Sequence, residues 1–343
     1  MSKNAFMKTM AGRNKLDGVN THSAPPHLWL STGSYAVNKA ISGRFDRGYA
    51  VGRMAMVTGP SDAGKSFVAM SAAVEAQKRG YGVFIVDSEN AIDDNYMEAV
   101  GLNLDDEFLL YNSINSLASG KKLTSNFISE YRDNKADIPP FLLLIDSLDE
   151  MRTKAHVEKE EKGVIHNDQG QKAKQLKQFA GDIMHEIRDL DIFGLATKQP
   201  YVNQDPIMSK VDPYIVTPSM RFPFSQIVML TNRRVKDAKT KKVEGIALNV
   251  LGYKTRFAKP RQKVTIDVPY DTGIDPFNGL LDIAQSLDVV SKTGAWYTYN
   301  EEKFQANSAD DETLNKILQD LIALDDKQNQ FVDVTDDEDE DSR

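Results

Sequence analysis

The stretch MAMVTGPSDAGKSFVAMSAAVEAQKRG, residues 54–80, decides how the rest of the chain is interpreted. Its first five residues are apolar or small and predict a short buried strand. A glycine-rich turn follows, and the next fifteen residues predict a helix that stops at Gly80. Between strand and helix, residues 59–66 fit the pattern GxxxxGK[ST] at every fixed position. This context predicts a phosphate-binding loop, because backbone N–H groups and a helix N-terminus attract phosphate oxygens.

The side chains of this loop predict the ligand in more detail. Lys65 is expected to reach the β and γ phosphates of a nucleotide, and the hydroxyl of Ser66 to bind Mg²⁺. The alternative, a glycine-rich turn without a ligand, stays open at this point. The expected nucleotide-binding residues are Gly59, Pro60, Ser61, Asp62, Ala63, Gly64, Lys65 and Ser66.

The pattern outside this loop predicts the fold class. Near-continuous apolar strands alternate with helices, which is typical of a mostly parallel sheet covered on both faces. These strands are expected at 82–89, 141–147 and 191–197, with helices around 95–100 and 171–190. Closer spacing then predicts antiparallel hairpins at one sheet edge, at 225–232, 244–252 and 262–270. We expect an α/β ATPase-type core with helices on both faces and an antiparallel edge.

Two acidic residues follow predicted strands. Asp146 ends the run FLLLID, and Glu89 follows the strand before it. Carboxyl ends of parallel strands face the ligand in such sheets, so Asp146 can orient the Mg²⁺ shell together with Ser66. Glu89 can polarise an attacking water. For Glu89, an exposed loop acid without a role is the alternative.

Composition excludes several classes of protein. The 343 residues contain no cysteine and five histidines, so disulfides, thiol catalysis and zinc–thiolate sites are excluded. The chain contains no run of about 18 apolar residues, so the sequence predicts no membrane span. Its first residues also lack the apolar core of a secretory signal. Hydrophobic residues make up 41% and charged residues 27%, as in ordinary globular proteins. We expect a cytoplasmic protein.

The net charge of −8 is unevenly distributed. From Asp325 to Arg343 there are nine acidic and two basic residues, so the rest of the chain is nearly neutral. We expect residues 306–343 to form a short helix near 311–324 and a disordered acidic tail, which gates DNA access or only increases solubility. Residues 1–28 are expected to form a basic arm.

Beyond these patterns, the chain resembles the RecA-type recombinases, and more closely their phage UvsX branch. The likeness covers about residues 28–305 and includes FIVDSENAIDDNYMEAVGL, VPYDTGIDPFNGLLDIA and KTGAWYTYNEEKF. It implies a catalytic role for Glu89, contacts of Asp93 and Tyr96 with the nucleotide, and ATP as that nucleotide. It also places Tyr270 near the base of a nucleotide bound by a neighbouring subunit.

The resemblance also implies two DNA-binding loops, near residues 153–169 and 200–220, within a core of residues 29–305. The DNA-binding residues expected in and after the first loop are Lys154, Lys159, Lys162, Lys172, Lys174 and Lys177. The alternative for these lysines is a solvated helix face. At the entrance of the second loop, Gln199 is expected to sense the γ-phosphate.

Four residues match family positions at the interface between subunits. Lys254 and Arg256 correspond to two cations that reach the ATP of a neighbour, and Arg221 and Phe222 to a cation–Phe pair after the second loop. An arginine-finger role in trans follows for the cations. The sequence shows no counterpart of a separate C-terminal DNA-gathering domain.

The resemblance implies an ATP- and Mg²⁺-dependent recombinase. It would form homo-oligomeric helical filaments on single-stranded DNA, pair them with duplex DNA and exchange strands, in the host cytoplasm if phage-encoded. A single-strand-binding protein and a loading mediator are the implied partners. Two alternatives remain open, a hexameric DNA helicase of the same fold and a non-enzymatic recombination mediator.

Overall fold

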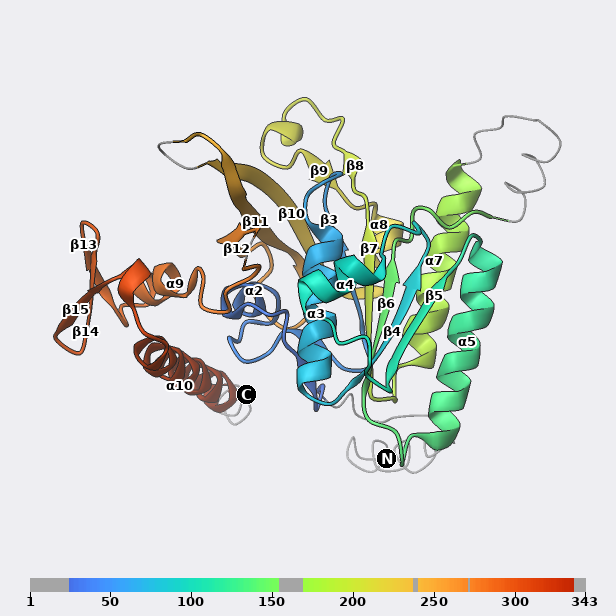
Figure 1. The fold of residues 1–343 in the computed structure, drawn as a ribbon, viewed down its shortest axis with the longest axis horizontal. Helices are drawn as coiled ribbons and strands as arrows, with labels where there is room; N and C mark the ends of the chain where they lie inside the picture. Colours follow the sequence, from blue (N-terminus) through green and yellow to red (C-terminus); the bar gives the residue numbers. More distant parts are fainter. Residues whose placement is uncertain (1–24, 154–168, 237–239, 271, 336–343) are drawn as a thin grey trace, which may run out of the picture.

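The computed structural model describes residues 25–153, 169–236, 240–270 and 272–335, which form an α/β core with a smaller C-terminal unit beside it (Figure 1). An eight-stranded sheet forms the centre, in the order β12-β11-β10-β3-β7-β6-β4-β5. Strands β10 to β5 of this order run parallel, whereas β11 and β12 are antiparallel additions at one side. The predicted fold class is therefore confirmed. The strands are β3 (Met54–Thr58), β4 (Gly82–Asp87), β5 (Leu109–Ser113), β6 (Phe141–Asp146), β7 (Ile192–Lys198), β10 (Phe224–Lys236), β11 (Val243–Thr255) and β12 (Lys263–Pro269).

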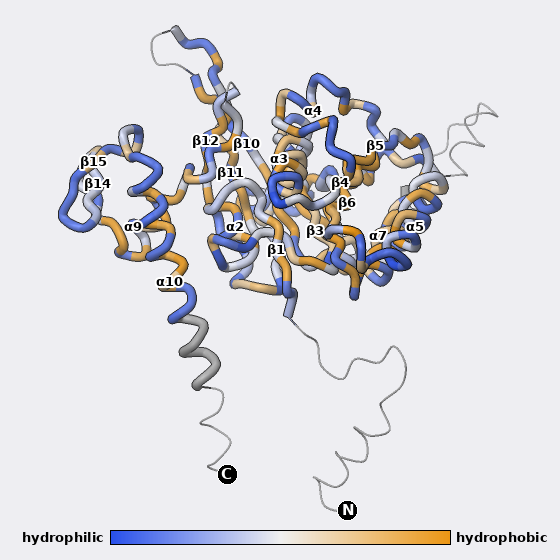
Figure 2. The backbone as a smooth tube through the Cα atoms, turned by 60° about the horizontal axis from the view of Figure 1, so that its bottom comes forward, coloured by the Kyte–Doolittle hydropathy of each residue, from blue (hydrophilic) through white to orange (hydrophobic). Residues whose placement is uncertain are grey.

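Helices cover both faces of this sheet (Figure 1). Successive residues of a strand point to opposite faces, so Ala55 and Val57 of β3 join one core cluster while Met54 and Met56 join the other. Figure 2 shows β3 and β6 as predominantly hydrophobic, as expected for strands buried on both sides. The first face is covered by α2 (Tyr35–Ser42), α3 (Lys65–Lys78) and α4 (Asp94–Val100), and the second by α5 (Leu117–Asn134), α7 (Gln169–Glu186) and α8 (Pro218–Arg221).

The carboxyl ends of the parallel strands meet at one edge of the sheet, which we call the carboxyl edge. Thr58 pairs in register with Lys198 and Met229, and Asp87 pairs with Asp146. The phosphate-binding loop starts directly after Thr58, so it lies at this edge together with both aspartates. The opposite end of the sheet, where β3 and β10 begin, is called the amino edge.

A smaller unit follows β12 and packs around a core of its own. Leu280, Tyr297 and Ile317 are buried in this cluster, which the sequence analysis did not anticipate. Figure 1 shows the unit beside the main sheet. Its elements are α9 (Leu280–Ser286), β13 (Ser291–Thr293), β14 (Trp296–Tyr299), β15 (Glu302–Gln305), η2 (Ala306–Ser308) and α10 (Asp311–Thr335). Near the N-terminus, β1 (Trp29–Leu30) pairs with β2 (Tyr49–Ala50).

Helix α10 is longer than predicted, because it continues past Leu324 to Thr335. The start of the segment expected to be disordered is thus helical. Asp325 is almost fully buried and pairs with Lys39 of α2, and Asp326 pairs with Arg44. These two ion pairs fix the middle of α10 against the core. The acidic residues after Thr335 lie outside the described residues, as do residues 1–24 of the expected basic arm.

Candidate active site

The backbone of the phosphate-binding loop explains its two fixed glycines. A β-carbon on Gly59 would lie 2.6 Å from the carbonyl oxygen of Leu230, so only glycine fits there. Gly64 has φ 87° and precedes the first turn of α3, a conformation that costs other residues energy. Asp62 also has a positive φ, 60°, which aspartate tolerates better than most residues. The loop therefore presents backbone N–H groups at the N-terminus of α3, as a phosphate site requires.

Lys65 lies among acidic residues at the carboxyl edge. Its ammonium group donates a hydrogen bond to the carbonyl of Pro60 at 3.0 Å. Burial lowers the pKa of Lys65, and the negative charges of Glu89 and Asp146 oppose this effect. A partly desolvated cation interacts more strongly with phosphate than an exposed one, because the local dielectric is lower. The position supports the predicted contact of Lys65 with nucleotide phosphates.

Asp146 and Ser66 are brought together as predicted. Burial raises the pKa of Asp146, while hydrogen bonds from Thr197 and Ser66 lower it. The hydroxyl of the adjacent Ser147 is buried and has no hydrogen-bond partner among the described residues. Mg²⁺ prefers oxygen ligands and commonly takes one or two from the protein and the rest from phosphates and water. This donor set fits Mg²⁺: Ser66 and Asp146 would hold the ion, which would neutralise phosphate charge.

Glu89 is exposed in a loop whose shape is fixed by Asp87, a residue that the sequence analysis missed. Asp87 is fully buried and accepts hydrogen bonds from the backbone N–H groups of Glu89, Asn90 and Ile92 at 2.8–3.2 Å. The hydroxyl of Tyr111 also lies 2.9 Å from its carboxylate. Burial, aided by Asp87, raises the pKa of Tyr111 to about 12. The sequence did contain a signal for this role, because Asp87 precedes the candidate base Glu89 by only two residues.

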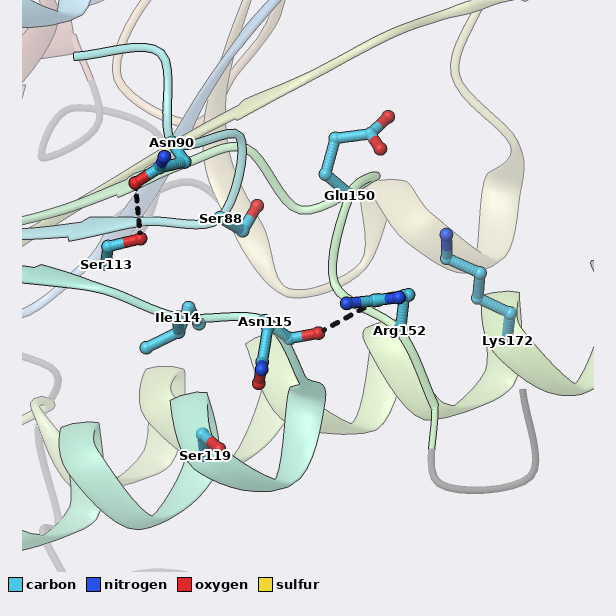
Figure 3. A pocket seen from close by; sticks show the side chains of 9 residues that line it. All are labelled: Ser88, Asn90, Ser113, Ile114, Asn115, Ser119, Glu150, Arg152 and Lys172. Carbon is cyan, nitrogen blue, oxygen red and sulfur yellow. Dashed lines mark hydrogen bonds between the residues drawn. The ribbon is translucent and has the colours of Figure 1, made fainter. Parts of the chain in front are cut away.

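A polar cavity of about 730 Å³ borders this loop (Figure 3). Ser88 and Asn90, on either side of Glu89, both line it, and Asn90 accepts a hydrogen bond from Ser113 at 3.0 Å. Arg152, beyond the end of β6, and Lys172, in the first turn of α7, line the far side. Water therefore has access to the loop that carries Glu89.

The expected base-contacting residues divide between two positions. Asp93 caps α4 by accepting a hydrogen bond from the N–H of Tyr96, so both belong to one turn. Burial raises the pKa of Tyr96 to about 12, and the charge of Asp146 adds to this shift. Tyr270 follows β12 at the carboxyl edge, and a β-carbon on nearby Gly273 would lie 3.6 Å from the ring of Phe67 in α3. Tyr270 is 62% exposed, and its expected contact with the nucleotide of a neighbouring subunit stays a prediction.

The lysines expected to bind DNA are only partly brought together. Lys154, Lys159 and Lys162 lie outside the described residues. On α7, Lys174 and Lys177 are exposed as predicted. Lys172 instead donates a hydrogen bond to the backbone carbonyl of Asp149, so it is turned toward the protein.

The second loop, expected at 200–220, has more structure than its sequence suggested. Strands β8 (Tyr201–Val202) and β9 (Tyr214–Ile215) pair, and the 3₁₀ turn η1 (Met208–Lys210) lies between them. The loop is tied to the core by an ion pair between Asp212 and Arg261. Its exposed apolar side chains are Tyr201, Val202, Ile207, Met208 and Val211. Exposed apolar and aromatic groups of this kind can contact nucleic-acid bases.

A basic hairpin is a further feature that the sequence analysis did not assign. The hairpin of β10 and β11 extends past the carboxyl edge, since Met229 is the last residue of β10 paired with β3. The exposed cations on its described part, which we call the basic hairpin, are Arg233, Arg234, Lys236, Lys241 and Lys242. Such a cluster is the electrostatic signature of nucleic-acid binding.

The expected interface residues lie at the amino edge, away from the phosphate-binding loop. Lys254 pairs in register with Ile227 near the start of β10, and its ammonium group donates to the carbonyls of Arg221 and Phe224 at 2.6 Å. Arg256 is exposed, and Phe222 is 62% exposed. Burial lowers the pKa of Lys254 to about 8, and the charges of Arg256 and Arg221 contribute. These groups cannot reach the nucleotide site of their own chain.

Comparison with known proteins assigns the family. Residues 15–275 match the RecA N-terminal domain. The chain belongs to the RecA family. Residues 278–306 match the RecA C-terminal domain. The expectation that no separate DNA-gathering domain follows this stretch stays a prediction. The RecA protein of Limosilactobacillus reuteri is 30% identical over 80% of this chain and 71% of its own length. The RecA protein of Phytoplasma mali is 26% identical over 85% of this chain and 82% of its own length. The RecA protein of Oceanobacillus iheyensis is 28% identical over 85% of this chain and 80% of its own length.

The family assignment confirms the enzyme class expected from the sequence. RecA-family proteins are DNA-dependent ATPases with recombinase activity, and the intact site residues of this RecA-family chain agree with that class. No helix within the described ranges is long and apolar enough to cross a membrane.

Proposed function

We propose that this protein is an ATP-dependent recombinase of the phage UvsX type, which assembles on single-stranded DNA and exchanges strands with duplex DNA. The placement of the nucleotide and interface residues at opposite edges of one sheet carries this proposal. Lys65, Ser66, Glu89 and Asp146 lie at the carboxyl edge, whereas Lys254 lies at the amino edge. A nucleotide bound at one edge then meets Lys254 of the next subunit, and repeated head-to-tail contacts give an open filament.

The chemistry follows from the site. Lys65 and the loop N–H groups would bind the phosphates, and Ser66 and Asp146 would hold Mg²⁺, which neutralises charge on the transferred group. Glu89 would orient and deprotonate the attacking water. In the next subunit, Lys254 and Arg256 would stabilise the developing charge. Gln199, at the start of the second loop, would contact the γ-phosphate.

The DNA would bind along the carboxyl edge. Lys174, Lys177, Lys154, Lys159 and Lys162 would contact phosphates of the first strand, and the apolar side chains of the second loop would contact its bases. The basic hairpin would hold the duplex. Most of the affinity would be electrostatic and independent of sequence, and homology would be read by base pairing.

The phage assignment rests on the resemblance to the UvsX branch over about residues 28–305. It implies a location in the host cytoplasm and the partners of phage recombination. These are a single-strand-binding protein and a loading mediator. Residues 1–28 would act as an arm between subunits.

The decisive experiment measures ATP hydrolysis with and without single-stranded DNA, in the wild type and in Lys65→Ala. We expect strong stimulation by DNA that is lost in the variant. Hydrolysis that DNA does not change would contradict the proposal. Electron microscopy with an ATP analogue and DNA then distinguishes open filaments from the closed rings of a hexameric helicase, and a strand-exchange assay distinguishes a recombinase from a non-enzymatic mediator.

A further inference from the structure

Asp149 lies where the nucleotide site meets the second loop. It follows Asp146 by three residues, beyond the end of β6. One carboxylate oxygen pairs with the ammonium group of Lys198, the last residue of β7. The other accepts a hydrogen bond from the backbone N–H of Gln199, at the entrance of the second loop. Both oxygens of this side chain are therefore used to hold the junction between β7 and that loop.

Lys198 makes this contact specific. Lys198 is 4% exposed, and a buried ammonium group requires a compensating negative charge nearby. Its ammonium group also lies 5.3 Å from the ring of Tyr201, in the second loop. The ion pair therefore fixes the start of the second loop relative to the end of β6.

Asp149 also contacts the start of α7. The ammonium group of Lys172 donates to the backbone carbonyl of Asp149. Asp149, Lys172, Leu176, Lys198, Gln199 and Tyr201 surround one cavity of about 280 Å³. The charge of Asp149 also acts on Lys65 in the phosphate-binding loop. Asp149 thus touches the β6 end, the second loop and α7, and its charge is felt at the nucleotide site.

We propose that Asp149 is a positioning residue that couples nucleotide binding to DNA binding through the second loop. The proposal rests on the function proposed above and adds a residue to it. Asp149 holds the backbone of Gln199, so a movement of the β6 end on nucleotide binding is transmitted to Tyr201 and Val202. Coupling between two sites is reciprocal, so DNA must change nucleotide affinity by the same factor.

The test replaces the ion pair by apolar side chains of similar size, Asp149→Leu with Lys198→Met, because such replacements of buried pairs often preserve the fold. The matched control is Lys39→Met with Asp325→Leu, which removes a comparably buried pair between α2 and α10. Affinity for single-stranded DNA is measured with and without a non-hydrolysable ATP analogue, together with basal ATP hydrolysis.

We expect the nucleotide to increase DNA affinity about tenfold less in the Asp149 double variant than in the wild type. The control should keep the full effect. A folded double variant with unchanged coupling would overturn the proposal and leave the pair as a purely stabilising contact. If the nucleotide does not change the DNA affinity of the wild type, that result would instead contradict the proposed function. Should the double variant not fold, Asp149→Asn alone is measured, and full coupling there overturns the proposal.

Discussion

Asp87 shows how a residue that does not touch the reaction can determine its geometry. Three backbone N–H groups and one tyrosine hydroxyl converge on its buried carboxylate, and they fix the loop on which Glu89 stands. A general base must hold its position to within a fraction of an ångström to act on a water molecule. In the proposed reaction, Asp87 would therefore act by orienting Glu89, the proposed base.

Removing one of these hydrogen bonds provides a test. In Tyr111→Phe, we expect kcat for ATP to fall about tenfold, because Glu89 is held less firmly. KM should stay nearly constant, and unfolding free energy should fall by about 1 kcal/mol. The control is Tyr49→Phe, because the buried hydroxyl of Tyr49 has no hydrogen-bond partner among the described residues. Steady-state kinetics and thermal unfolding measure both effects, and an unchanged kcat in Tyr111→Phe would contradict this role of Asp87.

The low pKa of Lys254 predicts a pH dependence. With a pKa of about 8, its ammonium group loses its proton as pH rises through that value. We expect kcat/KM for ATP to fall above about pH 8, since this parameter reports on the free protein. Lys254→Arg keeps its charge, because arginine stays protonated, so its profile should stay flat over the same range. A wild-type profile without a decline between pH 7 and 9 would argue against a catalytic charge at this position.

Among the elements, the basic hairpin extends past the carboxyl edge of the sheet. When a cation that binds a phosphate is removed, the slope of log affinity against log salt falls by about one for duplex DNA. Arg233→Ala with Arg234→Ala should therefore reduce that slope by about two, uniformly across sequences. Lys316→Ala, which removes an exposed cation of α10, is the control and should not change this slope. Titrations of duplex DNA at several salt concentrations measure the slope, and an unchanged slope would exclude these arginines from the contact.

Helix α10 changes how the acidic end of the chain should be tested. A deletion that begins at Asp325 would also remove the ion pairs with Lys39 and Arg44. Deleting only residues 336–343 removes charge and keeps these contacts. We expect duplex DNA to bind more tightly after this deletion at low salt, and the difference to disappear at high salt, where the charges are screened. Equal affinities at low salt would show that this segment does not compete with DNA.

Local sequence predicted some elements well and others poorly. The strand, loop and helix around Lys65 were predicted because their signals lie within 27 consecutive residues. Strand β5 was missed, since it is an edge strand whose residues are mostly not buried. The extent of α10 was missed because Asp325 is fixed by Lys39, which is 286 residues away. The role of Asp149 depends on Lys198 and Lys172, so a pattern read along the chain does not reveal it.

At the scale of the whole molecule, the two edges of the sheet carry complementary halves of one proposed site. Lys65→Ala and Lys254→Ala should each be inactive alone. When the two variants are mixed in equal amounts, about a quarter of the junctions in a head-to-tail assembly pair an intact Lys65 with an intact Lys254. DNA-stimulated hydrolysis should therefore recover to about a quarter of the wild-type rate per subunit. A mixture as inactive as either variant would show that the two lysines do not serve a site between neighbours.

The distance between these edges has a further consequence for the polymer. In the proposed filament the two ends would differ, because one terminal subunit would expose a phosphate-binding loop without a partner and the other would expose Lys254 without one. A polymer of n subunits then contains one fewer complete site than subunits. Turnover per subunit would be lowest in the shortest oligomers and would rise toward a plateau with length. Subunits added at one end would bring their own nucleotide to the new junction, whereas at the other end they would complete a site that is already loaded, so growth has a direction.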